Sequence, residues 1–197
     1  FGELITLLET DKRLGSDNEI RVRLPYSGKS FGVPANLHII GTMNTADRSI
    51  ALLDTALRRR FVFKELMPDP TVLPTNVDGI DLQKLLSRIN ERIEYLFDRE
   101  HQIGHAYLID CDKREDVETA IRNAIIPLLA EYFFDDWSKI AVVLEGKPVS
   151  GDDNFSGRFL DGHRLSLDGF ENEELSSHAR LRWEVKKQFD FAEFAAT

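Results

Sequence analysis

An asparagine and an arginine triplet lie on two neighbouring parts of the chain, and both residue types can act on phosphate groups. Asn44 follows a short apolar run at residues 37–40. Arg58, Arg59 and Arg60 follow a helix-like stretch further along the chain. An amide can orient an attacking water, and a guanidinium can neutralise the charge that develops during phosphoryl transfer. Alone, each has a plainer explanation as a turn residue or a helix end, but their combination favours a nucleotide site.

The elements that would position these groups are a buried strand and the helix after it. Residues 37–42 contain the apolar run of a strand buried on both faces of a sheet, while Ile50, Leu53 and Leu57 recur at helical spacing. Open α/β sheets bind ligands at the carboxyl ends of their strands, where Asn44 would lie. Three consecutive arginines at a helix end cannot all face the same partner. At least one should therefore point outward.

Four sequence words occur in an order that resembles one family. They are MNTADRS at 43–49, ALRRRF at 56–61, IGHAY at 103–107 and PLLAEYFFDD at 127–136. Up to about Lys147, the chain resembles the AAA+ motor subunit of the McrBC type of modification-dependent restriction system. The resemblance implies an α/β fold: the C-terminal half of an AAA+ P-loop NTPase core, followed by an α-helical lid subdomain.

The resemblance also implies roles for individual residues. Asn44 would be the sensor 1 residue, which positions the attacking water or senses the γ-phosphate. Arg59 would be the arginine finger that reaches a neighbouring subunit's nucleotide, with Arg60 as the near alternative. Asp47 and Arg48 would contact the nucleotide or an interface, although a helix N-cap and a surface ion pair explain them equally well.

A histidine lies between the expected lid helices, in Gly104-His105-Ala106-Tyr107. By resemblance, His105 would act near the phosphates or at the lid interface. The competing explanation is a packed histidine bonded to a backbone carbonyl.

The resemblance implies a ring of identical subunits, hexameric in form, that hydrolyses GTP with Mg²⁺ and activates an McrC-type endonuclease. The single cysteine suits a reducing cytosol, so we expect a cytoplasmic protein. Two alternatives stay open: a MoxR- or midasin-like ATPase chaperone, and a non-catalytic oligomerisation or docking module. The net charge of −9 opposes non-specific attraction to nucleic acid, so DNA contacts are expected mainly from other domains or subunits.

One word imitates a P-loop. Gly28-Lys29-Ser30 looks like its second half, but Arg23 stands where the first glycine should be, and residues 31–34 cannot open a helix. We predict a β-hairpin across residues 20–33 instead. Neither Walker A nor an acidic Walker B strand end is visible, so we expect a fragment that starts just after Walker B and is inactive alone.

Composition is that of an ordinary globular protein: 197 residues, 42% hydrophobic and 30% charged. The single cysteine, Cys111, permits no internal disulfide and lies between Asp110 and Asp112, which would disfavour a reactive thiolate. The five histidines show no metal-ligand spacing, so no metal site is predicted. No apolar stretch approaches the length of a membrane span.

The chain divides by composition at a proline-punctuated stretch that begins at Met67. We assign 1–67 to the AAA+ core, 68–147 to the helical lid and 148–197 to an extension of unknown role. Apolar spacing predicts helices over 82–97, 117–133 and 137–144, with Pro127 interrupting the second. Short strands are expected at 157–161 and 164–167.

Overall fold

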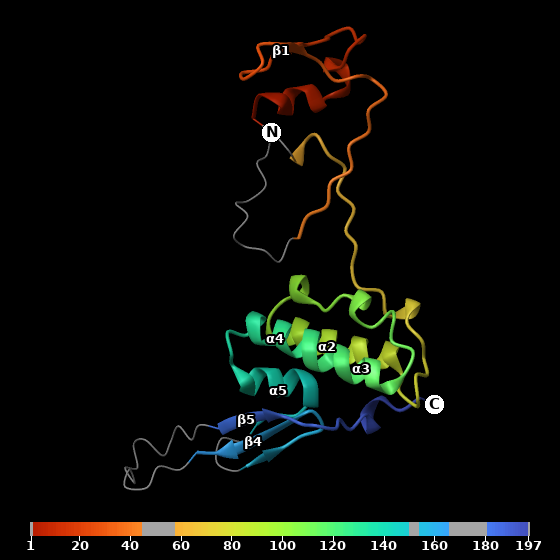
Figure 1. Ribbon diagram of the computed structural model, residues 1–197, viewed down its shortest axis with the longest axis vertical. Coiled ribbons are helices and arrows are strands. Elements are labelled where there is room, and N and C mark those ends of the chain that lie inside the picture. Colours follow the sequence, from red (N-terminus) through yellow and green to blue (C-terminus); the bar gives the residue numbers. More distant parts are fainter. Residues whose placement is uncertain (1, 45–57, 150–153, 166–180, 197) are drawn as a thin grey trace. The chain divides into compact units, whose positions relative to one another are not determined.

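The computed structural model describes residues 2–44, 58–149, 154–165 and 181–196 (Figure 1). The chain divides into two compact units, unit 1 (Phe1–Leu66) and unit 2 (Met67–Thr197). Both contain helices and small antiparallel sheets.

Unit 1 contains the predicted β-hairpin. Strands β1 (Val22–Arg23) and β2 (Ser30–Phe31) pair antiparallel after the 3-10 helices η1 (Gly2–Leu8) and η2 (Thr10–Lys12). The amide of Leu24 donates to the carbonyl of Lys29 at 2.9 Å, and Gly28 adopts φ +66°, which glycine tolerates without steric cost. The hairpin prediction is confirmed, and Gly28-Lys29 belongs to its turn rather than to a P-loop.

The strand predicted at residues 37–42 is not a strand in the structure, so this prediction was wrong. The segment pairs with neither described strand of unit 1, and its apolar side chains are exposed, Ile40 to 94%. A strand of a parallel sheet needs hydrogen-bonded neighbours and covering helices, which the described residues do not supply here. The helix expected around Ile50–Leu57 lies outside the described residues, as do Asp47 and Arg48.

Unit 2 is built around the predicted helices. The longest, α2 (Leu82–Leu96), begins at Asp81, whose carboxylate accepts from the amide of Lys84 at 3.0 Å. Its apolar residues recur on one face and are buried, as the periodicity predicted. The other α-helices among the described residues of this unit are α3 (Arg114–Ala120), α4 (Ile126–Tyr132) and α5 (Trp137–Glu145).

The interruption predicted at Pro127 takes the form of a π-helical segment. Residues Ile121–Ile125 connect α3 to α4 with the wider turn, and the amide of Ile126 donates to the carbonyl of Ile121. Proline has no amide hydrogen and its ring crowds the preceding turn, so the regular ladder cannot continue through it. Such π-helical turns are a known cause of kinks in α-helices.

A three-stranded antiparallel sheet follows the helices. Strands β3 (Phe155–Ser156), β4 (Leu160–Arg164) and β5 (Leu181–Val185) pair in that order, with Gly162 opposite Trp183. Strands were expected in this region, but their bounds differ from the predicted ones by several residues. Short 3-10 helices complete the unit: η3 (Pro70–Val72), η4 (Arg99–His101), η5 (His105–Tyr107) and η7 (Ala192–Phe194).

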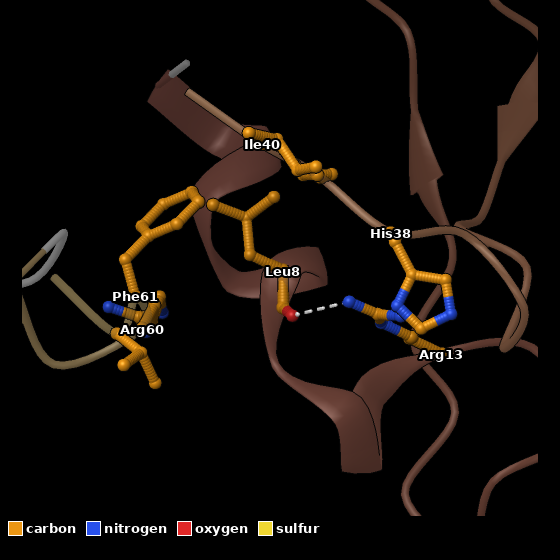
Figure 2. Close-up of a pocket in the computed structure, with 8 residues that line it drawn as sticks. Leu8, Arg13, His38, Ile40, Arg60 and Phe61 are labelled. Atoms are coloured by element: carbon orange, nitrogen blue, oxygen red, sulfur yellow. Dashed lines mark hydrogen bonds between the residues drawn. The ribbon is translucent and has the colours of Figure 1, made fainter. Parts of the chain in front are cut away.

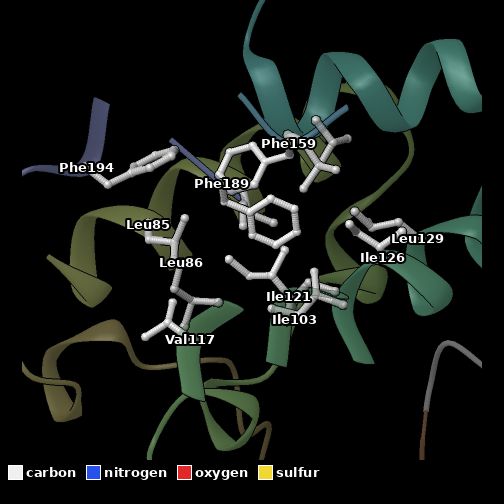
Figure 3. Close-up of a cluster of buried hydrophobic side chains, with 14 of the residues drawn as sticks. Leu85, Leu86, Ile103, Val117, Ile121, Ile126, Leu129, Phe159, Phe189 and Phe194 are labelled. Atoms are coloured by element: carbon white, nitrogen blue, oxygen red, sulfur yellow. The ribbon is translucent and has the colours of Figure 1, made fainter. Parts of the chain in front are cut away.

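The described parts of 148–197 share one core with the lid helices. Phe159, Phe189 and Phe194 are buried in the same cluster as the apolar faces of α2, α3 and α4 (Figure 3). The rings of Phe159 and Phe189 lie 5.2 Å apart. Buried Glu145 of α5 accepts hydrogen bonds from three successive amides, those of Arg158, Phe159 and Leu160.

Candidate functional site

The three arginines have different surroundings within unit 1. Arg58 and Arg59 are exposed, whereas the side chain of Arg60 is only 13% exposed. Nη2 of Arg60 lies 2.5 Å from the carboxylate of Glu9, which follows η1. The prediction that the arginines do not share one partner agrees with this arrangement. Arg60 is held inside unit 1, and Arg59 is the more accessible of the two proposed finger residues.

Arg59 and Arg60 line one hollow of unit 1. Its volume is about 430 Å³, and Glu9, Thr10 and Asp11 line the other side. The pKa of the Asp11 carboxyl is held below its ordinary value, chiefly by its hydrogen bond with Lys12. The hollow therefore carries both signs of charge next to the arginines.

A second, larger pocket lies beside Arg60 and has a volume of about 510 Å³ (Figure 2). Arg13 crosses its wall: Nη2 donates to the carbonyl of Leu8 at 3.2 Å and Nη1 to the carbonyl of Leu37 at 2.6 Å. Arg13 thereby fixes the segment that leads to Asn44 against the end of η1. The pocket is lined by Leu8, Arg13, His38, Ile39, Ile40, Arg60, Phe61 and Val62.

Sequence reasoning did not find Arg13 or Glu9, although both support the candidate site. Glu9 and Arg60 are fifty-one positions apart, and nothing in local composition marks them as partners. The structure does bring the segment before Asn44 together with Arg60, because Ile39, Ile40 and Arg60 line the same pocket. Asn44 itself is exposed, and its expected neighbours Asp47 and Arg48 lie outside the described residues.

His105 belongs to unit 2 and lies at the start of η5. Its Nδ1 accepts a hydrogen bond from the backbone amide of Asp69 at 3.0 Å. The packed-histidine alternative expected a carbonyl partner, but the partner is an amide. A neutral His105 with Nδ1 as acceptor carries its proton on Nε2, so the other ring nitrogen is a donor. The ring is half-buried.

A second histidine, His101, is buried and pairs with Asp98. Sequence reasoning did not anticipate this contact. Its Nδ1 lies 2.7 Å from Oδ1 of Asp98, and the rings of Phe97 and Tyr132 meet it edge-on at 4.3 and 4.7 Å. Burial by itself would raise the pKa of Asp98. The hydrogen bond and charge of His101, together with the amides of Glu100 and His101, outweigh burial and lower it. The pair lies at the start of η4, where Asp98 is the N-cap residue.

Cys111 is unsuited to thiolate chemistry. Burial raises the pKa of its thiol, and the carboxylates of Asp116, Asp110 and Asp112 raise it further. The prediction of a disfavoured thiolate is confirmed, with burial as the larger cause.

Across residues 2–44, 58–149, 154–165 and 181–196, no cluster of three or more His, Cys, Asp and Glu could hold a metal ion. No helix in these same ranges is long and apolar enough to cross a membrane.

The helical part of unit 2 is similar to a known protein family. Residues 81–141, which begin at the N-cap of α2 and end within α5, match the family described as the McrB alpha-helical lid domain. The chain is also 36% identical over 160 residues to the Type IV methyl-directed restriction enzyme EcoKMcrB subunit of Escherichia coli (strain K12). This is an McrB-type chain.

The match to the McrB subunit covers 69% of this chain and 34% of that relative. The chain therefore spans about a third of the length of the curated relative it matches. The McrB-type lid accounts for α2, α3 and α4, and the helical lid expected from the sequence is present. His105, Cys111 and the His101–Asp98 pair all lie within it.

Proposed function

We propose that this chain is part of the nucleotide-hydrolysing motor of a modification-dependent DNA restriction complex. The proposed substrate is GTP, taken with Mg²⁺, and the proposed assembly is a cytoplasmic ring of identical subunits. An McrC-type endonuclease would be the partner that the ring activates. The observation that carries the proposal is the similarity to a restriction enzyme subunit combined with a recognisable McrB-type lid.

Within this function we assign different tasks to Arg59 and Arg60. Arg59 is the finger that acts on a neighbouring subunit's nucleotide, and its exposure supports that task. Arg60 instead supports the fold of unit 1, because Glu9 holds its guanidinium there. A desolvated arginine whose charge is already compensated gains less from a phosphate than an exposed one does.

Asn44 is proposed as the sensor 1 residue. Its amide would hold the attacking water in line with the γ-phosphate, while Arg59 of an adjacent copy stabilises charge on the transferred group. Arg13 supports Asn44 indirectly, because it fixes the carbonyl of Leu37 seven residues before it. Asp47 and Arg48 stay proposed nucleotide or interface residues, and His105 is proposed to offer its Nε2 hydrogen at the lid.

The described residues contain no recognisable binding site for Mg²⁺. No described metal-ligand cluster exists, and the only G-K-S word is a hairpin turn. The tasks that we propose for this chain are the orientation of water and the neutralisation of phosphate charge.

The test is nucleotide turnover by the full-length protein, measured with GTP and with ATP, alone and with its neighbouring gene product. We expect turnover of GTP in preference to ATP, and stimulation by the partner. ATP turnover on protein substrates would favour a MoxR-like chaperone instead. Absence of turnover with either nucleotide would favour a non-catalytic oligomerisation module.

A further inference from the structure

His105 holds the segment through which the chain enters unit 2. Its Nδ1 accepts a hydrogen bond from the backbone amide of Asp69 at 3.0 Å. Both sequence neighbours of Asp69 are prolines, Pro68 and Pro70, which carry no amide hydrogen. Asp69 therefore has the one backbone donor of residues 68–70, and His105 accepts it. The prolines also restrict the backbone here, and Asp69 is extended at φ −113° and ψ 99°.

Helix α2 fixes the loop that carries His105. Asn90 of α2 is only 6% exposed and bonds both backbone groups of Ile103. Its Nδ2 donates to the carbonyl of Ile103 at 2.9 Å, and its Oδ1 accepts from the amide of Ile103 at 2.7 Å. Breaking either bond would leave a buried polar group unpaired, which is costly. Because Ile103 lies two residues before His105, the imidazole extends from a firmly held backbone.

The same helix holds the next turn of the entering segment. Nε2 of Gln83 donates to the carbonyl of Thr71 at 3.3 Å and to that of Leu73 at 2.8 Å. The carboxylate of Asp69 in turn accepts from the amide of Thr71 at 2.9 Å, as the N-cap of η3. The His105 bond extends this anchoring by two residues towards the start of unit 2, from Thr71 to Asp69.

The stretch before Asp69 continues from the arginines of unit 1. Arg59, the proposed finger, lies ten positions before Asp69, and residues 62–69 form neither helix nor strand. A stretch of this kind absorbs backbone rotation, whereas an anchored residue does not. Each residue released from its anchor adds up to about 3.4 Å to the reach of the stretch. The bond at Asp69 therefore limits how much movement the stretch can absorb between the lid and Arg59.

We propose that His105 is a positioning residue for nucleotide hydrolysis. By anchoring Asp69, its Nδ1 couples movement of the lid to the stretch that carries Arg59. The inference rests on the proposed nucleotide turnover and deepens it, because it gives Nδ1 a task that is separate from the hydrogen on Nε2.

The test separates the two ring nitrogens of His105 in the full-length protein. His105→Asn places an amide oxygen one bond from Cγ, where it can accept in place of Nδ1, but it has no group at the position of Nε2. His105→Gln can place an amide hydrogen near that position, but it has no acceptor at the position of Nδ1.

Amide hydrogen exchange, followed by mass spectrometry, reports on the bond itself. Pro68 and Pro70 contribute no exchangeable amide, so the signal of residues 68–70 belongs to Asp69. We expect this amide to exchange roughly tenfold faster in His105→Gln than in the wild type, because its hydrogen bond is lost. His105→Asn should retain most of the protection.

Turnover of GTP should follow the bond. We expect kcat of His105→Gln to fall roughly tenfold and KM to change with it, because residues at a joint affect closure and binding together. His105→Asn should lose only what the Nε2 hydrogen contributes, and so keep the higher kcat of the two. His163→Gln is the matched control, the same substitution at an exposed histidine of unit 2. It should leave kcat and the exchange of Asp69 unchanged.

Three results would overturn the proposal. One is unchanged exchange of the Asp69 amide in His105→Gln, and another is wild-type kcat despite faster exchange. The third is a higher kcat in His105→Gln than in His105→Asn, which would assign the task to Nε2. Melting temperatures express each kcat per folded molecule, so a loss that disappears on this scale would make the contact structural only. Absent turnover of GTP and ATP by the wild type would instead remove the proposed function, and the positioning role with it.

Discussion

At the scale of single residues, the surroundings of each charged group decide its proposed task more than its place in a motif does. Arg59 and Arg60 are adjacent in sequence, yet Glu9 lies against only one of them among the described ion pairs. An arginine that already has a carboxylate partner within its own unit is suited to support. An exposed arginine next to it is suited to reach a neighbour.

Replacing Arg59 should separate these tasks. We expect Arg59→Ala in the full-length protein to lower GTP turnover by about 10³- to 10⁵-fold, the range for assigned arginine fingers, while its own nucleotide affinity stays unchanged. Arg60→Ala is the matched control and should lower stability by about 1 kcal/mol or less, because Glu9 stays partly exposed. GTP turnover and nucleotide affinity, the latter by titration, are measured for both variants. A fall in affinity that equals the fall in turnover would contradict the finger assignment.

Asn44 should act mainly in the transition state. We expect Asn44→Ala to lower kcat by about 10²-fold while nucleotide binding stays nearly intact, because a water-positioning amide contributes little to the ground state. Steady-state kinetics with GTP and an equilibrium binding measurement provide the check. Equal activity of variant and wild type would remove Asn44 from the site.

The His101–Asp98 pair gives unit 2 a predictable acid sensitivity. The pKa of Asp98 in the folded state lies below its ordinary value of 3.8, so the carboxylate contributes stability above that pH. This contribution is lost as the pH falls through the lower, folded-state pKa, which places the loss below about pH 4. Urea unfolding from pH 6 to pH 2 should show it. Asp98→Asn retains a capping oxygen but cannot titrate. The free energy of unfolding of this variant should therefore change less between about pH 4 and pH 2 than that of the wild type. An equal pH dependence in both proteins would contradict this explanation.

At the scale of elements, local patterns predicted the helices well and the strand poorly. Helix α2 was predictable because its apolar spacing and its cap at Asp81 both lie within the segment itself. The segment 37–42 was misassigned because a buried strand depends on neighbours that its own apolar run cannot specify. Glu9 as the partner of Arg60 and Asp69 as the partner of His105 were equally invisible, since each contact joins distant positions.

Glu145 is the residue that should report most directly on the link between α5 and the C-terminal sheet. Its carboxylate accepts from the amides of Arg158 at 2.6 Å, Phe159 at 2.7 Å and Leu160 at 3.2 Å. Glu145→Gln turns one acceptor oxygen into a donor that faces an amide, so we expect a loss of about 1–3 kcal/mol in the free energy of unfolding. Urea denaturation measures it. Glu131→Gln is the matched control, because Glu131 is exposed. If both variants lose the same small amount of unfolding free energy, the buried carboxylate of Glu145 is not a structural link.

At the scale of the whole molecule, the McrB-type lid extends further than its matched family range. The family match ends at residue 141, but the core of unit 2 also contains Phe159, Phe189 and Phe194. Two further links join α2 to this region: Arg92 donates to the carbonyl of Val143 at 3.0 Å and pairs with Glu193. A segment that sequence reasoning treated as a separate extension thus shares the structural core of the lid.

The proposed function also makes a prediction about assemblies of many copies. If Arg59 acts on a neighbour's nucleotide, the finger and the phosphate-binding loop of one active site belong to different subunits. Mixing full-length Arg59→Ala with a separate variant of the phosphate-binding loop should then restore part of the GTP turnover that each lacks alone. Mixed rings contain junctions where an intact loop meets an intact finger. The measurement is turnover against mixing ratio, with mixed assembly shown independently by mass spectrometry. Mixed rings that stay inactive at every ratio would place Arg59 outside the neighbouring site.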